Sequence, residues 1–195
     1  MPDERRRTIL LGLAFMMFLA VSYFENTFFF QILRDVLQNQ FLAVFMFFVH
    51  NVLVISLILL AMTFYVNLVL LNFFKREKHA NVVIEHPRIF ALIFTLVIVF
   101  ISILRGGSLL GGIDIESLPL ILLISTPIAI VEGYGIYLTI SKTLSRTMST
   151  KSLAYIYGIF FIAAIMEVGF INLLIWVSNN GLFGFQAFNF LYLFS

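Results

Sequence analysis

The chain is 195 residues long, and 62% of its residues are hydrophobic while only 11% are charged. Soluble globular proteins average roughly 45–50% apolar and about 25% charged residues. So few charges cannot cover so much apolar surface in water, which excludes a soluble globular fold. The net charge is only +2, with the basic residues scattered in short loops, so we expect no nucleic-acid partner. The sequence therefore predicts a multi-pass protein of the cell membrane.

Five apolar segments are long enough to cross a membrane, because about 20 helical residues span a hydrocarbon core of roughly 30 Å. They are residues 8–30, 41–74, 87–107, 118–141 and 152–177. The first is not followed by a small-residue cleavage motif, so we expect a retained helix. The second would be about 51 Å long, so it must tilt, protrude or break. The predicted fold class is an all-α, five-span helical bundle forming one transmembrane domain over residues 1–195.

The basic residues predict the orientation of this bundle. The N-terminal segment and the loops after the second and fourth spans hold 3, 4 and 3 of them, and the other two loops hold one each. Because basic loops stay cytoplasmic, we expect the N-terminus inside and the C-terminus outside. The last stretch, residues 182–195, is uncharged, aromatic and too short to span. We expect an interfacial helix there, either as an anchor at the membrane surface or as a docking surface for a partner.

Charged and polar residues within the spans are the candidate functional residues, because polar groups are costly in hydrocarbon. They include Glu25, His50, Glu132 and Glu167, with Asn51 beside the histidine. Counting residues from the ends of the spans places Glu25, His50 and Glu167 in one outer layer and Glu132 nearer the cytoplasm. One interpretation is a proton or cation path through these side chains. The other is helix–helix contact, in which each hydrogen bond contributes about 0.6–2 kcal/mol.

The surroundings of Glu132 favour a special role for the fourth span. Pro127 removes a backbone hydrogen bond and can kink the helix. Gly133 and Gly135 would let another helix or a ligand approach closely. A kink, a carboxylate and two small residues together are typical of a binding site, and equally of a closely packed helix–helix interface.

No enzyme motif accompanies these residues. The sequence contains no HExxH, no GxSxG and no phosphate-binding glycine loop. It has no cysteine, and the spans contain no aspartate pair. His79 and His86 belong to a charged loop between the second and third spans, and we expect that loop to be solvated. We therefore expect no catalytic residues, no metal site and no cofactor.

Two short stretches resemble the stage II sporulation protein M family of polytopic membrane proteins. Residues 47–51 (FFVHN) are similar to the aromatic run of that family that ends in an Asn-bearing polar pair. Pro127 and Glu132 keep the spacing of its Pro-His-Gly-x-x-Glu motif, with Ile128 and Ala129 in place of His-Gly. The resemblance implies a small multi-span protein without known catalysis, related to a membrane partner of a peptidoglycan-remodelling assembly. It implies packing or gating roles for Glu132 and the His50–Asn51 pair.

Two functions agree with these features. The first is a non-enzymatic membrane subunit or scaffold of a larger complex, with membrane lipids and other membrane protein subunits as its partners. The alternative is a small permease or proton-coupled transporter, oligomeric in its own right, that uses the carboxyl groups inside the spans.

Overall fold

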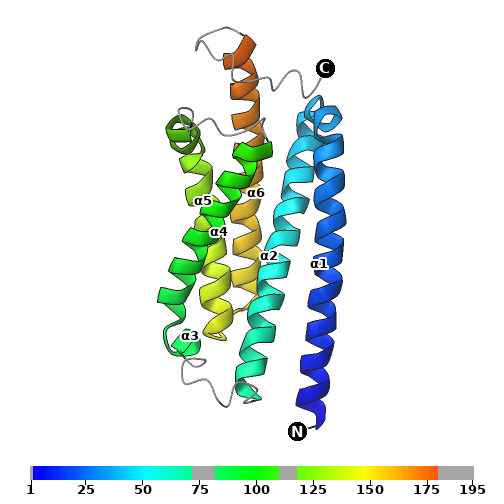
Figure 1. Ribbon diagram of the computed structural model, residues 1–195, viewed down its shortest axis with the longest axis vertical. Helices are drawn as coiled ribbons and strands as arrows, with labels where there is room; N and C mark the ends of the chain where they lie inside the picture. Colours follow the sequence, from blue (N-terminus) through cyan, green and yellow to red (C-terminus); the bar gives the residue numbers. More distant parts are fainter. Residues whose placement is uncertain (1, 72–81, 110–117, 180–195) are drawn as a thin grey trace.

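The chain folds into a bundle of long helices (Figure 1). The computed structural model describes residues 2–71, 82–109 and 118–179, and these ranges contain no strand. The helices are α1 (Pro2–Leu37), α2 (Gln40–Leu70), α3 (Val82–Glu85), α4 (Pro87–Leu109), α5 (Leu118–Leu144) and α6 (Thr150–Asn179). The prediction of an all-α fold is therefore confirmed. The expected interfacial helix over 182–195 lies outside the described residues.

Three helices are long and apolar enough to cross a membrane. They are Arg5–Phe29 of α1, Gln40–Leu70 of α2 and Thr150–Leu173 of α6, and α4 contributes a shorter apolar run, Pro87–Ser102. These helices support the prediction of a membrane protein. The long second apolar segment is a single helix as far as Leu70, so it does not break over its described length.

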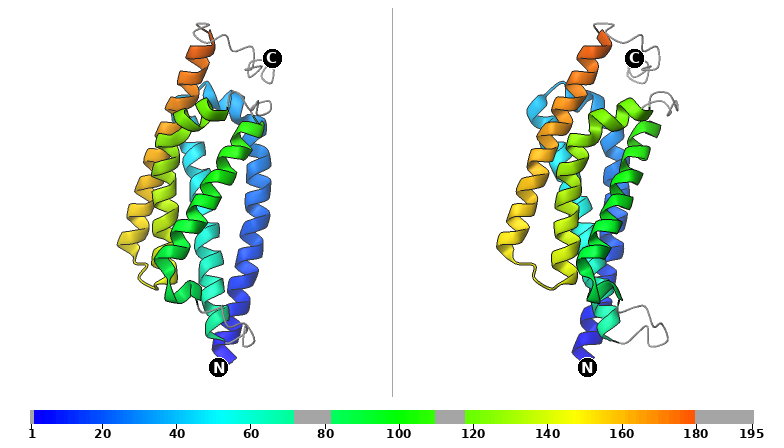
Figure 2. Two further views of the ribbon diagram at one scale, coloured as in Figure 1. Left: turned by 60° about the vertical axis from the view of Figure 1, so that its left-hand side comes forward. Right: turned by 90° about the vertical axis from the view of Figure 1, so that its left-hand side faces the viewer.

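Three of the helices form the centre of the bundle. α2, α5 and α6 contact one another, while α1 packs against α2 and α4 packs against α5 (Figure 2). The largest buried side chains of this centre are Phe160, Ile55, Ile140, Leu144 and Ile156. Lipid tails are as apolar as these side chains, so close packing, rather than escape from water, has to hold the helices together in a membrane. The outward faces of α1 and α4 are apolar and exposed.

Polar residues in the turns define where two of the helices begin. Asn39 accepts hydrogen bonds from the backbone N–H groups of Phe41 and Leu42, at 3.1 and 3.3 Å, and so caps α2. Ser149 accepts a bond from the N–H of Ser152 at 3.2 Å at the start of α6. Such caps satisfy N–H groups that have no partner within the helix. They set the sharp turns that return α2 and α6 into the bundle.

The two ends of the bundle differ in charge. The N-terminus and the turn between α5 and α6 lie at the same end (Figure 1). Basic residues gather in these segments: Arg5, Arg6, Arg7, Lys142, Arg146 and Lys151. We call this end the basic end, and the other the opposite end.

The bend of α5 agrees with the kink expected from the sequence. Pro127 lies inside α5, and the first turns of this helix run at a steep angle to the rest (Figure 2). A proline within a helix removes one backbone hydrogen bond and clashes with the preceding turn, which produces such a bend.

α5 ends in a left-handed turn that glycine usually occupies. The N–H of Thr147 donates to the carbonyl of Lys142 at 2.9 Å, and the N–H of Arg146 donates to that of Thr143 at 3.1 Å. This pattern is a Schellman motif, which needs a left-handed residue after the helix. Arg146 occupies that position with a φ of 55°. A side chain in this conformation costs roughly 1 kcal/mol or more relative to glycine.

We therefore expect Arg146→Gly to stabilise the protein by about 1 kcal/mol, because glycine adopts this φ without strain. The apparent melting temperature of the purified protein in detergent measures the gain. Arg146→Ala is the matched control, since it removes the same charge but keeps the strain. Equal stability of the two variants would show that the turn is not strained.

Candidate functional site

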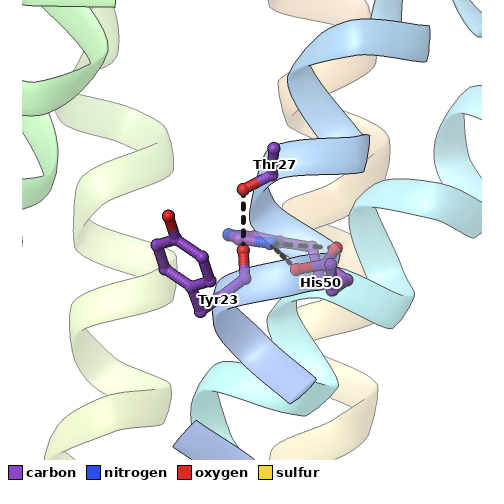
Figure 3. A network of polar contacts seen from close by, with 4 residues as sticks. Tyr23, Thr27 and His50 are labelled. Atoms are coloured by element: carbon purple, nitrogen blue, oxygen red, sulfur yellow. Dashed lines mark hydrogen bonds and ion pairs between the residues drawn. The ribbon is translucent and has the colours of Figure 1, made fainter. Parts of the chain in front are cut away.

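A histidine on α2 contacts a glutamate on α1. The Nδ1 atom of His50 lies 3.0 Å from Oε2 and 3.3 Å from Oε1 of Glu25, within hydrogen-bonding distance of both (Figure 3). The His50 ring also packs against the ring of Phe29, with centroids 5.0 Å apart. The side chains of His50 and Glu25 remain 25% and 20% exposed, which places this pair at the edge of the bundle.

The α1 segment that carries Glu25 has a local hydrogen bond of its own. The hydroxyl of Thr27 donates to the backbone carbonyl of Tyr23 at 3.0 Å, four residues earlier (Figure 3). This bond stays within one turn of α1 and makes no contact between helices. The polar contact of this segment with α2 is the one that Glu25 makes with His50.

The residue after His50 faces a different helix. Successive residues of a helix are turned by about 100°, so Asn51 points toward α6 while His50 points toward α1. Asn51 is buried, and its Nδ2 atom donates to Oε2 of Glu167 at 3.2 Å. The carboxyl groups of Glu167 and of Glu132 on α5 lie close enough to interact.

These contacts form two groups, Glu25 with His50 and Asn51 with Glu167 and Glu132, which meet at adjacent positions of α2. We call the five residues the polar network. Counting from the ends of the spans separates Glu132 from Glu167, whereas their carboxyl groups lie close enough to interact. The length of two glutamate side chains bridges the difference in depth along α5 and α6.

Of the candidate residues, Pro127 lies apart from this network. It stands more than one turn before Glu132 on α5, and its side chain is exposed. Its part in the site is to bend the helix that carries Glu132.

The proximity of Glu132 and Glu167 suits a pair of carboxyl groups that share a proton. Two ionised carboxylates side by side repel each other, and one bound proton removes that repulsion. Each carboxyl group of the network lies beside a nitrogen atom or another carboxyl group, an arrangement that is suited to binding and transferring protons. Within the described residues, no three acidic or histidine side chains are grouped to hold a metal ion.

Two apolar layers enclose the network, and neither could be recognised as a complete unit from the sequence. Toward the opposite end, the rings of Phe29 and Phe47 meet edge to face with centroids 5.0 Å apart. Toward the basic end, the ring of Phe160 lies against Gly135, with Ile55 beside it in the same cluster. The residue in the sequence that indicated the second layer is Gly135, because a glycine one turn from Glu132 lets a neighbouring helix approach closely.

The Glu25–His50 contact makes a testable contribution to stability. A double-mutant cycle with Glu25→Ala and His50→Ala is expected to give a coupling energy of about 0.6–1.7 kcal/mol, as for other polar pairs between membrane helices. Unfolding of the purified variants in detergent provides the measurement. The control cycle pairs Glu25→Ala with Asn51→Ala, whose side chain faces α6, and its coupling should be smaller. Zero coupling for the first pair would mean that the contact does not hold α1.

No protein family, no curated protein and no solved structure matches this chain.

Proposed function

We propose that the chain is a five-span membrane protein that moves protons through its polar network, as a small oligomeric permease or proton-coupled transporter. α4 and α5 have 23 and 27 residues. They would be about 35 and 41 Å long, enough to cross a hydrocarbon core of roughly 30 Å beside α1, α2 and α6. The basic end then faces the cytoplasm, because basic residues are retained there.

The observation that carries this proposal is the pair of ionisable contacts between helices, which meet at adjacent residues of α2. Glu25 meets His50 between α1 and α2, and Glu167 meets Glu132 between α6 and α5. Contact between helices alone needs only neutral groups such as amides and hydroxyls. Three carboxyl groups and a histidine in one network can also take up and release protons, and each transfer changes an interhelical contact.

Reconstituted vesicles test the proposal. The purified chain is inserted into liposomes that contain a pH-sensitive dye, and a potassium diffusion potential set with valinomycin drives protons inward. We expect acidification faster than in protein-free vesicles. A rate equal to that of protein-free vesicles, with and without candidate small solutes, would reject a proton-moving role.

A role as a subunit or scaffold of a larger membrane complex is the second candidate. The observation that favours it is the exposed apolar surface of α1, which includes Leu13, Met16, Met17, Phe24 and Phe28. Lipid or a second polypeptide can cover this surface. Gentle purification from native membranes, followed by the intact mass of the particle, separates the two cases. A stoichiometric second polypeptide supports the subunit role, and a homo-oligomer supports the transporter.

A further inference from the structure

An apolar layer closes the polar network on the side of the opposite end. Phe29 lies one turn beyond Glu25 on α1, and Phe47 lies about one turn before His50 and Asn51 on α2. Both rings are buried, and they meet edge to face with centroids 5.0 Å apart. Val36, Ala43, Ala164 and Val168 complete this buried cluster. The Phe29 ring also packs against the His50 ring, so the cluster borders the network directly and would exclude water and hydrated ions from that side.

A second apolar layer closes the network on the side of the basic end. Phe160 is 2% exposed and lies about two turns before Glu167 on α6. Its ring lies so close to Gly135 that a Cβ atom there would approach Cζ to 2.8 Å and Cε2 more closely still. Ile55, one turn after Asn51 on α2, belongs to the same cluster. The ring therefore fills the space that the missing side chain leaves between α5 and α6.

We propose that these two layers are the gates of the polar network, Phe29–Phe47 at the opposite end and Phe160 on Gly135 at the basic end. The structure then represents a closed state in which both gates exclude water. This inference rests on the proposed proton-moving function, because only a transporter needs to open the two sides in turn. It assigns gating roles to three phenylalanines, while the ionisable residues bind the proton.

The packing of the bundle indicates how each gate opens. α1 packs against α2 and presents few buried residues, so a tilt of α1 would separate Phe29 from Phe47. The gate at the basic end is made between α5 and α6, and it opens when the Phe160 ring leaves Gly135. The Glu25–His50 contact would hold the first gate shut, since it joins the same two helices one turn away.

Single cysteines test the gates directly, because the natural chain contains none. Ala164 is fully buried, lies between Phe160 and Glu167 on α6, and shares a cluster with Phe29 and Phe47. An Ala164→Cys reporter is treated with a positively charged, membrane-impermeant methanethiosulfonate reagent. The reagent is added from either side of sealed vesicles of known orientation, and the rate of labelling is measured by mass spectrometry.

Phe29→Ala should speed labelling from the side of the opposite end, and Phe160→Ala from the side of the basic end. We expect an increase of up to about tenfold for Phe29→Ala, since an aromatic pair contributes roughly 0.5–1.5 kcal/mol and 1.4 kcal/mol is tenfold. Phe160→Ala removes the whole ring from its place against Gly135 and should have an effect at least as large. The neighbouring residues are matched controls: Phe28 is 60% and Phe161 is 47% exposed. Phe28→Ala and Phe161→Ala should leave the rate at the level of the reporter alone.

Each alternative outcome overturns the inference. Labelling that rises equally from both sides, or equally in the controls, would mean that the phenylalanines pack the bundle without gating it. No increase in either gate variant would mean that the layers do not limit access. Phe29→Leu and Phe160→Leu, checked for a monodisperse elution profile, provide the same readout if an alanine variant fails to fold. Failure of the proposed function can be distinguished from failure of the gates. If the protein moves no protons, the side-specific labelling would still be observed.

Discussion

Gly135→Ala should lower the apparent melting temperature of the protein in detergent by several degrees. The added methyl group would overlap the ring of Phe160, which is buried among Ile136, Ile140 and Ile156, so making room for it disturbs the packing between α5 and α6. Overpacking of this kind costs about 1–3 kcal/mol, and the better helix propensity of alanine returns up to roughly 1 kcal/mol. The net loss of about 1–2 kcal/mol corresponds to roughly 2–8 °C for a chain of this size.

Gly158→Ala is the matched control, since no atom lies within 4 Å of a Cβ at that position of α6. This variant should be as stable as the natural chain or slightly more stable. Adding Phe160→Leu to Gly135→Ala should recover part of the loss, because the smaller side chain makes room for the methyl group. If Gly135→Ala and Gly158→Ala have the same melting temperature, the Phe160 ring and Gly135 do not make the contact that the structure describes.

The fold was largely predictable because hydrocarbon imposes a simple length rule on sequence. Each of the five apolar segments falls within one long helix over its described residues, and the turn before α2 carries a cap, Asn39. Helix ends were less predictable. α1 continues as far as Leu37, beyond the predicted end at residue 30, and Val36 in this extension is buried in the bundle. The sequence shows where an apolar segment ends, whereas backbone hydrogen bonding determines where the helix ends.

The candidate site was predictable in its residues but not in its arrangement. Glu25, His50, Asn51, Glu132 and Glu167 stand out because polar groups are rare in such apolar segments. Which of them meet depends on helix rotation and on the height at which each helix enters the bundle. Counting along the chain separates Glu132 from Glu167, whereas the structure joins them. The enclosing phenylalanines could not be distinguished at all, because the chain contains 24 phenylalanines and one apolar ring resembles another in sequence.

Glu132→Gln should abolish proton movement while leaving the bundle folded. Glutamine has almost the same shape as glutamate, and its amide can still hydrogen-bond to Glu167. It cannot release a proton near neutral pH, so a proton that arrives at Glu167 has no acceptor in α5. We expect the rate of proton entry into reconstituted vesicles to fall at least about tenfold, since general acid–base groups typically contribute 10²–10⁴-fold. The melting temperature should change little.

Two further substitutions separate the chemistry of this carboxyl group from its place in the bundle. Glu132→Asp keeps a carboxyl group on a shorter side chain, and it should retain part of the flux. Glu85→Gln removes an acid from the exposed end of α3, away from the network, and should leave the rate unchanged. Unchanged flux in Glu132→Gln would reject Glu132 as a proton carrier, whatever its role in packing. Glu132→Gln is expected to lose flux and to keep the stability of the natural chain. That result would mean that α5 carries a carboxyl group near Glu167 for proton transfer rather than for helix contact.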